Sequence, residues 1–185
     1  SVEAKNKVLS LARILAKYNN DITIHIVNFT DIQEAIYKNI PHEYLITIMR
    51  RMMYRISAII AHRRNCKILI NGESIGQVAS QTLTSMNAIG EVVNMPVIRP
   101  LACFDKLDII DIAKSIDTYE TSILPFEDCC TIFVPKHPVI NPDKMKCREY
   151  ETLIPYEELI HKAVKEHEML HLTSKNENME FKDLL

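Results

Sequence analysis

The stretch Lys67-Ile-Leu-Ile-Asn-Gly-Glu-Ser-Ile-Gly76 joins a short apolar run to a loop that contains two of the three glycines of the chain. The run 67–70 is typical of a strand buried in a parallel sheet. The residues after the loop predict a helix from Gln77 to about Val93. The stretch therefore predicts a strand, a loop and a helix in succession, which is the repeating unit of an α/β fold.

The same alternation continues on both sides of this stretch. β-branched or apolar runs predict strands at 22–27 and 97–98. Apolar residues at helical spacing predict helices over 1–19, 31–38, 41–64, 105–116 and 155–170, and a charged helix from about Pro142. We expect a parallel sheet with helices on both faces, whose ligands bind beyond the carboxyl ends of the strands. Two loops follow predicted strands there, 72–81 and 101–106.

Length and composition favour a globular protein with one core. The 185 residues suit a single domain over 1–172 with a polar tail over 173–185. The net charge of -2 is less positive than a segment that binds nucleic acid unaided would have. No apolar run is long enough to span a bilayer, so no membrane association is expected. Five cysteines without a disulfide spacing indicate free thiols, a reducing compartment and a cytoplasmic location.

The beginning of the chain also carries information. Residue 1 is Ser rather than Met, and the first residues already have a helical pattern. A nucleotide-binding domain normally places several glycines in a phosphate loop, whereas this chain has only Gly72, Gly76 and Gly90. We therefore expect that it starts partway through a domain, with the first strand and phosphate loop outside it.

Three residues are candidates for contacts with a nucleotide. Gly72 would let a ligand approach the backbone closely, and an ordinary strand-to-helix turn is the alternative. The amide of Gln81 could bond an adenine or a ribose, or simply be a polar surface group. Arg50, in the run Met49-Arg-Arg-Met-Met53, could contact a base or a phosphate, or belong to a solvated helix face.

Two further residues are candidates for chemistry. Lys106 could neutralise phosphate charge in a transition state, with a solvated lysine as the alternative. Cys129 lies in an irregular, Pro-containing segment, where its thiol is more accessible than a core thiol. The neighbouring Glu127 and Asp128 would raise its pKa, so activation requires a nearby cation such as Lys106.

The other cysteines and the histidines indicate no metal site. Adjacent Cys129 and Cys130 do not have zinc-finger spacing, and the histidines are scattered. No protein-bound metal is expected. Cys66 and Cys103 are expected to be structural, with Cys103 packed.

Together these segments resemble the family of ThiI-type tRNA 4-thiouridine synthases, which is also linked to thiamine biosynthesis. The resemblance runs from the first helix to about residue 150, and its stretch GESIGQVASQT over 72–82 is highly specific. The other matching stretches are Met49-Arg-Arg-Met-Met53, Val97-Ile-Arg-Pro-Leu101, Asp105-Lys106 and Pro125-Phe-Glu-Asp-Cys129.

The resemblance implies an adenine-nucleotide α-hydrolase fold with a PP-loop and a defined set of site residues. Arg50, Gly72 and Gln81 match nucleotide-contacting positions, Lys106 matches a lysine needed for activity, and Cys129 matches the cysteine that takes up persulfide sulfur. ATP with Mg²⁺, tRNA and a cysteine desulfurase are the implied cofactor and partners, and a homodimer is one expectation for the assembly. The SGGxDS PP-loop, the THUMP region and the rhodanese-like extension are absent from this sequence.

The activity implied is adenylation of uridine C4 followed by sulfur delivery from a persulfide on Cys129. A second thiol would resolve the persulfide, with Cys130, Cys103 and Cys147 as open candidates. Sulfur transfer in thiamine thiazole synthesis is an additional role. The alternatives are a degenerate, non-catalytic nucleotide-binding module and another PP-loop ATPase, such as an amidotransferase or a lysidine-type synthetase, which would not need Cys129.

Overall fold

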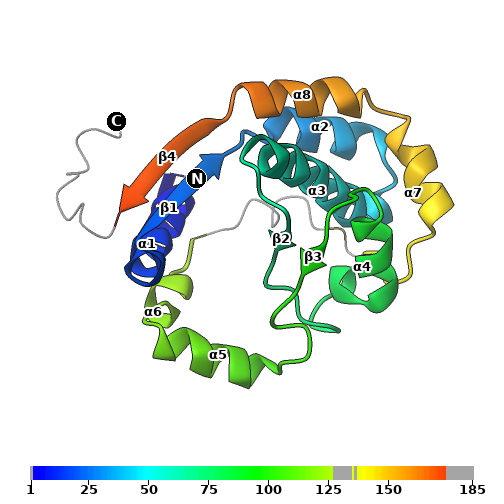
Figure 1. The fold of residues 1–185 in the computed structure, drawn as a ribbon. Helices are drawn as coiled ribbons and strands as arrows, with labels where there is room; N and C mark the ends of the chain where they lie inside the picture. Colours follow the sequence, from blue (N-terminus) through cyan, green and yellow to red (C-terminus); the bar gives the residue numbers. More distant parts are fainter. Residues whose placement is uncertain (1, 127–134, 136, 174–185) are drawn as a thin grey trace. The chain divides into compact units, whose positions relative to one another are not determined.

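The computed structural model describes residues 2–126, 135 and 137–173 (Figure 1). The described part of the chain forms two compact units. One comprises residues 2–26, 107–126 and 168–173, and the other comprises residues 27–106, 135 and 137–167. The single domain expected over 1–172 stays a prediction. Among the described helices, none combines the length and the apolar character needed to cross a membrane.

The first unit is built around an antiparallel strand pair. Its elements are α1 (Val2–Asn19), β1 (Asp21–Ile26), α5 (Lys106–Ser115) except its first residue, α6 (Tyr119–Ser122) and β4 (Glu168–Thr173). β1 pairs with β4 from Asp21 opposite Thr173 to Ile26 opposite Glu168. Asn20 makes the tight turn between α1 and β1 with a φ of 64°.

This pairing corrects two expectations. The strand near 22–27 exists, but its partner is antiparallel, so the predicted parallel sheet does not include it. The helix predicted over 155–170 ends at Lys165, and residues 168–173 form β4 instead. Residues 168–173 form a strand because their backbone N–H and C=O groups bond β1, which is far away in the sequence. A local pattern in the sequence cannot show this pairing.

The second unit contains the parallel pair. Its elements are α2 (Thr30–Asn39), η1 (His42–Tyr44), α3 (Leu45–Arg63), β2 (Leu69–Ile70), η2 (Ala79–Gln81), α4 (Leu83–Gly90), β3 (Val97–Ile98), α7 (Lys144–Glu151) and α8 (Tyr156–Lys165). β2 and β3 are parallel, with Leu69 opposite Val97 and Ile70 opposite Ile98. The α/β class and this parallel pair are confirmed, and both sheets of the described residues have two strands.

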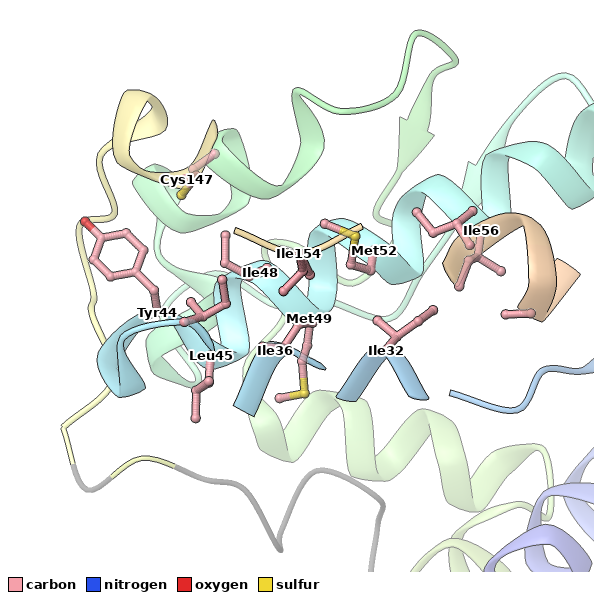
Figure 2. Close-up of a cluster of buried hydrophobic side chains, with 14 of the residues drawn as sticks. Ile32, Ile36, Tyr44, Leu45, Ile48, Met49, Met52, Ile56, Cys147 and Ile154 are labelled. Atoms are coloured by element: carbon pink, nitrogen blue, oxygen red, sulfur yellow. The ribbon is translucent and has the colours of Figure 1, made fainter. Parts of the chain in front are cut away.

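Helix α3 lies at the centre of the core of the second unit (Figure 2). The helical spacing of its apolar residues predicts a buried stripe, and the side chains of Ile48 and Met52 are fully buried. Ile32 and Ile36 of α2 and Cys147 of α7 pack against the same cluster. Burial of this stripe fixes α3, and the polar residues on its other faces thereby acquire defined positions.

The helix predicted from Gln77 to about Val93 is shorter than expected. Residues 79–81 form a single 3₁₀ turn, and α4 begins only at Leu83. Two local features account for the later start. Gly76 adopts a φ of 80°, and its N–H bonds the carbonyl of Gln81 at 2.9 Å. Thr82 then caps α4 by accepting a hydrogen bond from the N–H of Ser85 at 3.1 Å.

Candidate nucleotide-binding site

The loops that follow β2 and β3 lie side by side, as the parallel pairing of the two strands requires. The N–H of Ile75 bonds the carbonyl of Ala102 at 3.0 Å. The hydroxyl of Ser74 donates to the carbonyl of Phe104 at 2.9 Å, so this buried side chain joins the two loops. The carboxyl ends of the strands therefore carry one continuous surface built from both predicted loops.

A buried carboxylate, Glu73, organises this surface. It is 3% exposed and accepts hydrogen bonds from Arg50 of α3, from Nε of Arg99 at 2.6 Å and from the hydroxyl of Tyr54 at 3.0 Å. The side-chain amide of Asn71 donates to it as well, at 2.9 Å. Two guanidinium groups thus share one carboxylate, and one positive charge remains in excess.

The surroundings of Glu73 fix its charge state. Burial by itself would raise the pKa of the Glu73 carboxyl, but the hydrogen bond from Arg99 and the charge of Arg50 lower that pKa below its ordinary value. Burial and the neighbouring Glu73 charge raise the pKa of Tyr54, which therefore keeps its proton and donates it. The network is a stable arrangement of one anion, two cations and a neutral phenol at neutral pH.

The structure brings Arg50, Gly72 and Gln81 to this part of the second unit. The guanidinium of Arg50 donates to the hydroxyl of Ser80 at 2.9 Å, which connects α3 to the 3₁₀ turn that contains Gln81. Gln81 precedes the helix instead of lying one turn inside it. A Cβ added at Gly72 would meet Leu101 Cδ1 at 4.0 Å, an ordinary contact, so packing against the described residues does not require glycine there.

Of the two residues predicted to take part in the chemistry, Lys106 lies within the described residues and Cys129 does not. Lys106 is exposed and is the first residue of α5. Cys129 and its neighbour Cys130 lie outside the described residues, so the predicted role of Cys129 stays a prediction.

The remaining cysteines divide into exposed and buried thiols. Cys103 is exposed, so the expectation that it is packed is wrong: it follows β3 in a loop at the surface. Cys147 is buried in the core cluster that contains the apolar stripe of α3, and burial raises the pKa of its thiol to about 11. Cys66, after the end of α3, is exposed.

Sequence reasoning gave no role to Glu73, Arg99, Tyr54 or Asn71. Glu73 and Arg99 lie inside the stretches that carry the family resemblance, which was the available signal. The network of these four residues is not visible in the sequence, because α3, the loop after β2 and the residue after β3 each contribute to it. In the part of the chain that the structure describes, no group of three or more His, Cys, Asp or Glu side chains is arranged to bind a metal ion.

An α/β protein in which two arginines share a buried carboxylate beside the carboxyl ends of parallel strands has an arrangement suited to an anionic ligand. More specifically, the chain belongs to the ThiI family: residues 1–155 match the family described as "Thiamine biosynthesis protein (ThiI)".

Similar proteins carry related descriptions. The chain is 49% identical over 175 residues to a "Probable tRNA sulfurtransferase" of Brevibacillus brevis, covering 95% of this chain and 44% of the relative. It is 46% identical over 186 residues to one of Oceanobacillus iheyensis, covering 100% and 46%. The structure also resembles a crystal structure of a 4-thiouridine synthetase–RNA complex with bound ATP, with a TM-score of 0.87, 37% identity and coverage of 91% and 45%. The chain therefore spans less than half the length of these proteins.

Proposed function

We propose that the protein containing this chain is an ATP-dependent tRNA sulfurtransferase that forms 4-thiouridine. The single observation that carries this proposal is the arginine network around Glu73, built into the loops that match the family. The descriptions of the relatives, and the ATP and RNA in the similar crystal structure, agree with it. The chain supplies part of the ATP site and the sulfur-carrying thiol.

In this proposal the nucleotide lies against the loop after β2. Gly72 lets the ligand approach the backbone, Gln81 bonds its adenine or ribose, and Arg50 contributes positive charge. The excess positive charge of the network favours an anionic ligand over a neutral one. Mg²⁺ would enter the site bound to the phosphates of ATP, which are its usual ligands in ATP-dependent enzymes.

The first chemical step activates the uridine. The C4 oxygen of uridine is a poor leaving group, and adenylation converts it into a good one. The oxygen attacks the α-phosphate of ATP, an oxygen–phosphorus bond forms as the bond to pyrophosphate breaks, and the N3 proton of the uridine is lost to solvent. Lys106 stabilises the negative charge that develops on the phosphates. Its exposed position at the start of α5 leaves it available to a ligand.

The second step delivers sulfur. A cysteine desulfurase loads Cys129 with a persulfide, whose terminal sulfur attacks C4 while AMP leaves with the original oxygen. A second thiolate then attacks the sulfur of Cys129, which releases the thiouridine and forms a disulfide. Cys103 suits this role better than Cys147, because Cys103 is exposed and the pKa of Cys147 is about 11. The same persulfide serves sulfur transfer in thiazole synthesis.

The test uses the full-length protein, unmodified tRNA, ATP and a cysteine desulfurase. Wild-type protein is expected to form 4-thiouridine, whereas Cys129→Ser abolishes thiolation and still binds ATP. Cys66→Ser is the matched control, since Cys66 is exposed at the end of α3 and its loss leaves activity unchanged. Normal thiolation by Cys129→Ser would remove Cys129 from the reaction. ATP binding without thiolation by wild type would favour a non-catalytic module.

A further inference from the structure

We propose that Glu73 is a positioning residue of the nucleotide site, which holds Arg50 and Arg99 side by side, and that Arg99 is a second arginine contacting the phosphates of the nucleotide. The inference rests on the proposed function, since it assigns two more residues to the same ATP site. Its basis is the geometry of one buried carboxylate whose two oxygens bind different arginines.

Both oxygens of Glu73 are held in place. Oε1 binds Arg50, whereas Oε2 accepts from Arg99, from the Tyr54 hydroxyl and from the Asn71 amide. The N–H of Glu73 also bonds the side-chain oxygen of Asn71 at 3.1 Å, which fixes the loop itself. A carboxylate with this many partners cannot turn without leaving a buried polar group unsatisfied. Glu73 therefore fixes the positions of both guanidinium groups before any ligand arrives.

The two arginines keep binding capacity for a ligand. Their side chains are 22% and 20% exposed, unlike the buried carboxylate between them. Arg50 donates one hydrogen bond to Ser80 and one to Glu73. Arg99 donates to Glu73, to the carbonyl of Val97 and to the hydroxyl of Tyr54. A guanidinium has more donors than these contacts with the described residues use. The free donors and the excess positive charge suit phosphate oxygens.

Glu73 itself is too deeply buried to touch the nucleotide, so it acts through the arginines. Replacing it with Gln keeps the side-chain size but removes the charge that fixes both guanidinium groups. Loss of a hydrogen bond to a charged group corresponds to about a 10–100-fold change in an equilibrium constant. We expect Glu73→Gln to raise the dissociation constant for ATP by about this factor.

A double-mutant cycle separates positioning from a general effect on folding. The dissociation constant for ATP is measured by calorimetry for the full-length wild type, Glu73→Gln, Arg50→Gln and the double variant. If Glu73 acts through the arginines, its loss costs several-fold less in the Arg50→Gln background than in wild type. Fully additive effects would overturn the positioning role. Glu34→Gln, which removes an exposed carboxylate paired with Lys38, is the matched control and leaves ATP binding unchanged.

Two more variants complete the test. Arg99→Gln is expected to weaken ATP binding about tenfold, and unchanged binding would overturn the role of Arg99. If Glu73→Gln does not fold, Tyr54→Phe replaces it in the cycle, because it removes the hydroxyl that bonds Glu73, Arg99 and Asn71 without changing any charge. Its effect on ATP binding must likewise shrink in the Arg50→Gln background. A folded wild type that binds no ATP would overturn the proposed function together with this inference, whereas ATP binding with an additive cycle overturns the inference alone.

Discussion

Arg50 and Arg51 are neighbours on α3, yet the side chain of Arg51 is buried and that of Arg50 is partly exposed to solvent. Arg51 is 1% exposed, and its guanidinium donates twice to Glu151, at 2.7 and 2.9 Å, once to Glu91 and once to the carbonyl of Ala88. Arg50 is 22% exposed and donates to Glu73 and Ser80. One step along a helix thus separates an arginine used by the fold from a partly exposed one, which we propose binds the nucleotide. Burial and the number of satisfied donors distinguish the two roles, whereas residue type does not.

The network around Arg51 connects several elements of the second unit. Glu151 of α7 also accepts from Arg55 of α3, and Glu91, directly after α4, also binds Arg148 of α7. The network therefore joins α3, α7 and the end of α4 by charged contacts. Arg51, which lies at the centre of the network, is almost fully buried, as expected for an arginine in a structural ion pair.

The largest effect is expected from removing Arg51. Arg51→Met leaves the buried Glu151 with Arg55 as its remaining ion-pair partner among the described residues, and should lower the free energy of unfolding by about 3–5 kcal/mol. Denaturant unfolding followed by circular dichroism measures this change. Arg148→Met is the control, because Arg148 is 58% exposed and its loss should cost less than about 1 kcal/mol. Equal stability of Arg51→Met and wild type would mean that the buried network does not stabilise the fold.

A smaller effect, on a different quantity, is expected from Arg50. Arg50→Gln should weaken ATP binding about tenfold or more, because it removes a phosphate-binding cation from the proposed site. Its effect on the free energy of unfolding should be well below that of Arg51→Met, since Arg50 is partly solvated. Calorimetry and denaturant unfolding on the same protein sample measure both quantities. Loss of stability with unchanged ATP affinity would reverse the roles assigned to the two arginines.

Local patterns allowed much of the fold to be predicted. The apolar stripe of α3 and the short apolar run at Val97-Ile98 are local signals, and both elements form as expected. β4 was missed because its partner β1 is more than a hundred residues away, so its six residues gave no independent signal. The start of α4 was misplaced because the turn at Gly76 and the cap at Thr82 outweigh the helical propensity of the residues between them.

Sequence patterns single out only some residues of the candidate site, for a similar reason. Gly72, Gln81 and Arg50 could be singled out because each lies in a distinctive local stretch. Glu73 and Arg99 are 26 residues apart, and the pair of Arg51 and Glu151 is separated by 100 residues. No periodicity relates such positions, so the different roles of Arg50 and Arg51 became visible only through their partners in space.

Hydrogen–deuterium exchange of the full-length protein, with and without ATP, tests the central claim most directly. If the nucleotide binds against the arginines held by Glu73, ATP should slow exchange in residues 71–82 and 97–106. Exchange in residues 144–156, a segment that includes Arg148 and Glu151 of the network around Arg51, should stay unchanged. Protection by ATP confined to residues 144–156, with none in the loops after β2 and β3, would contradict the account.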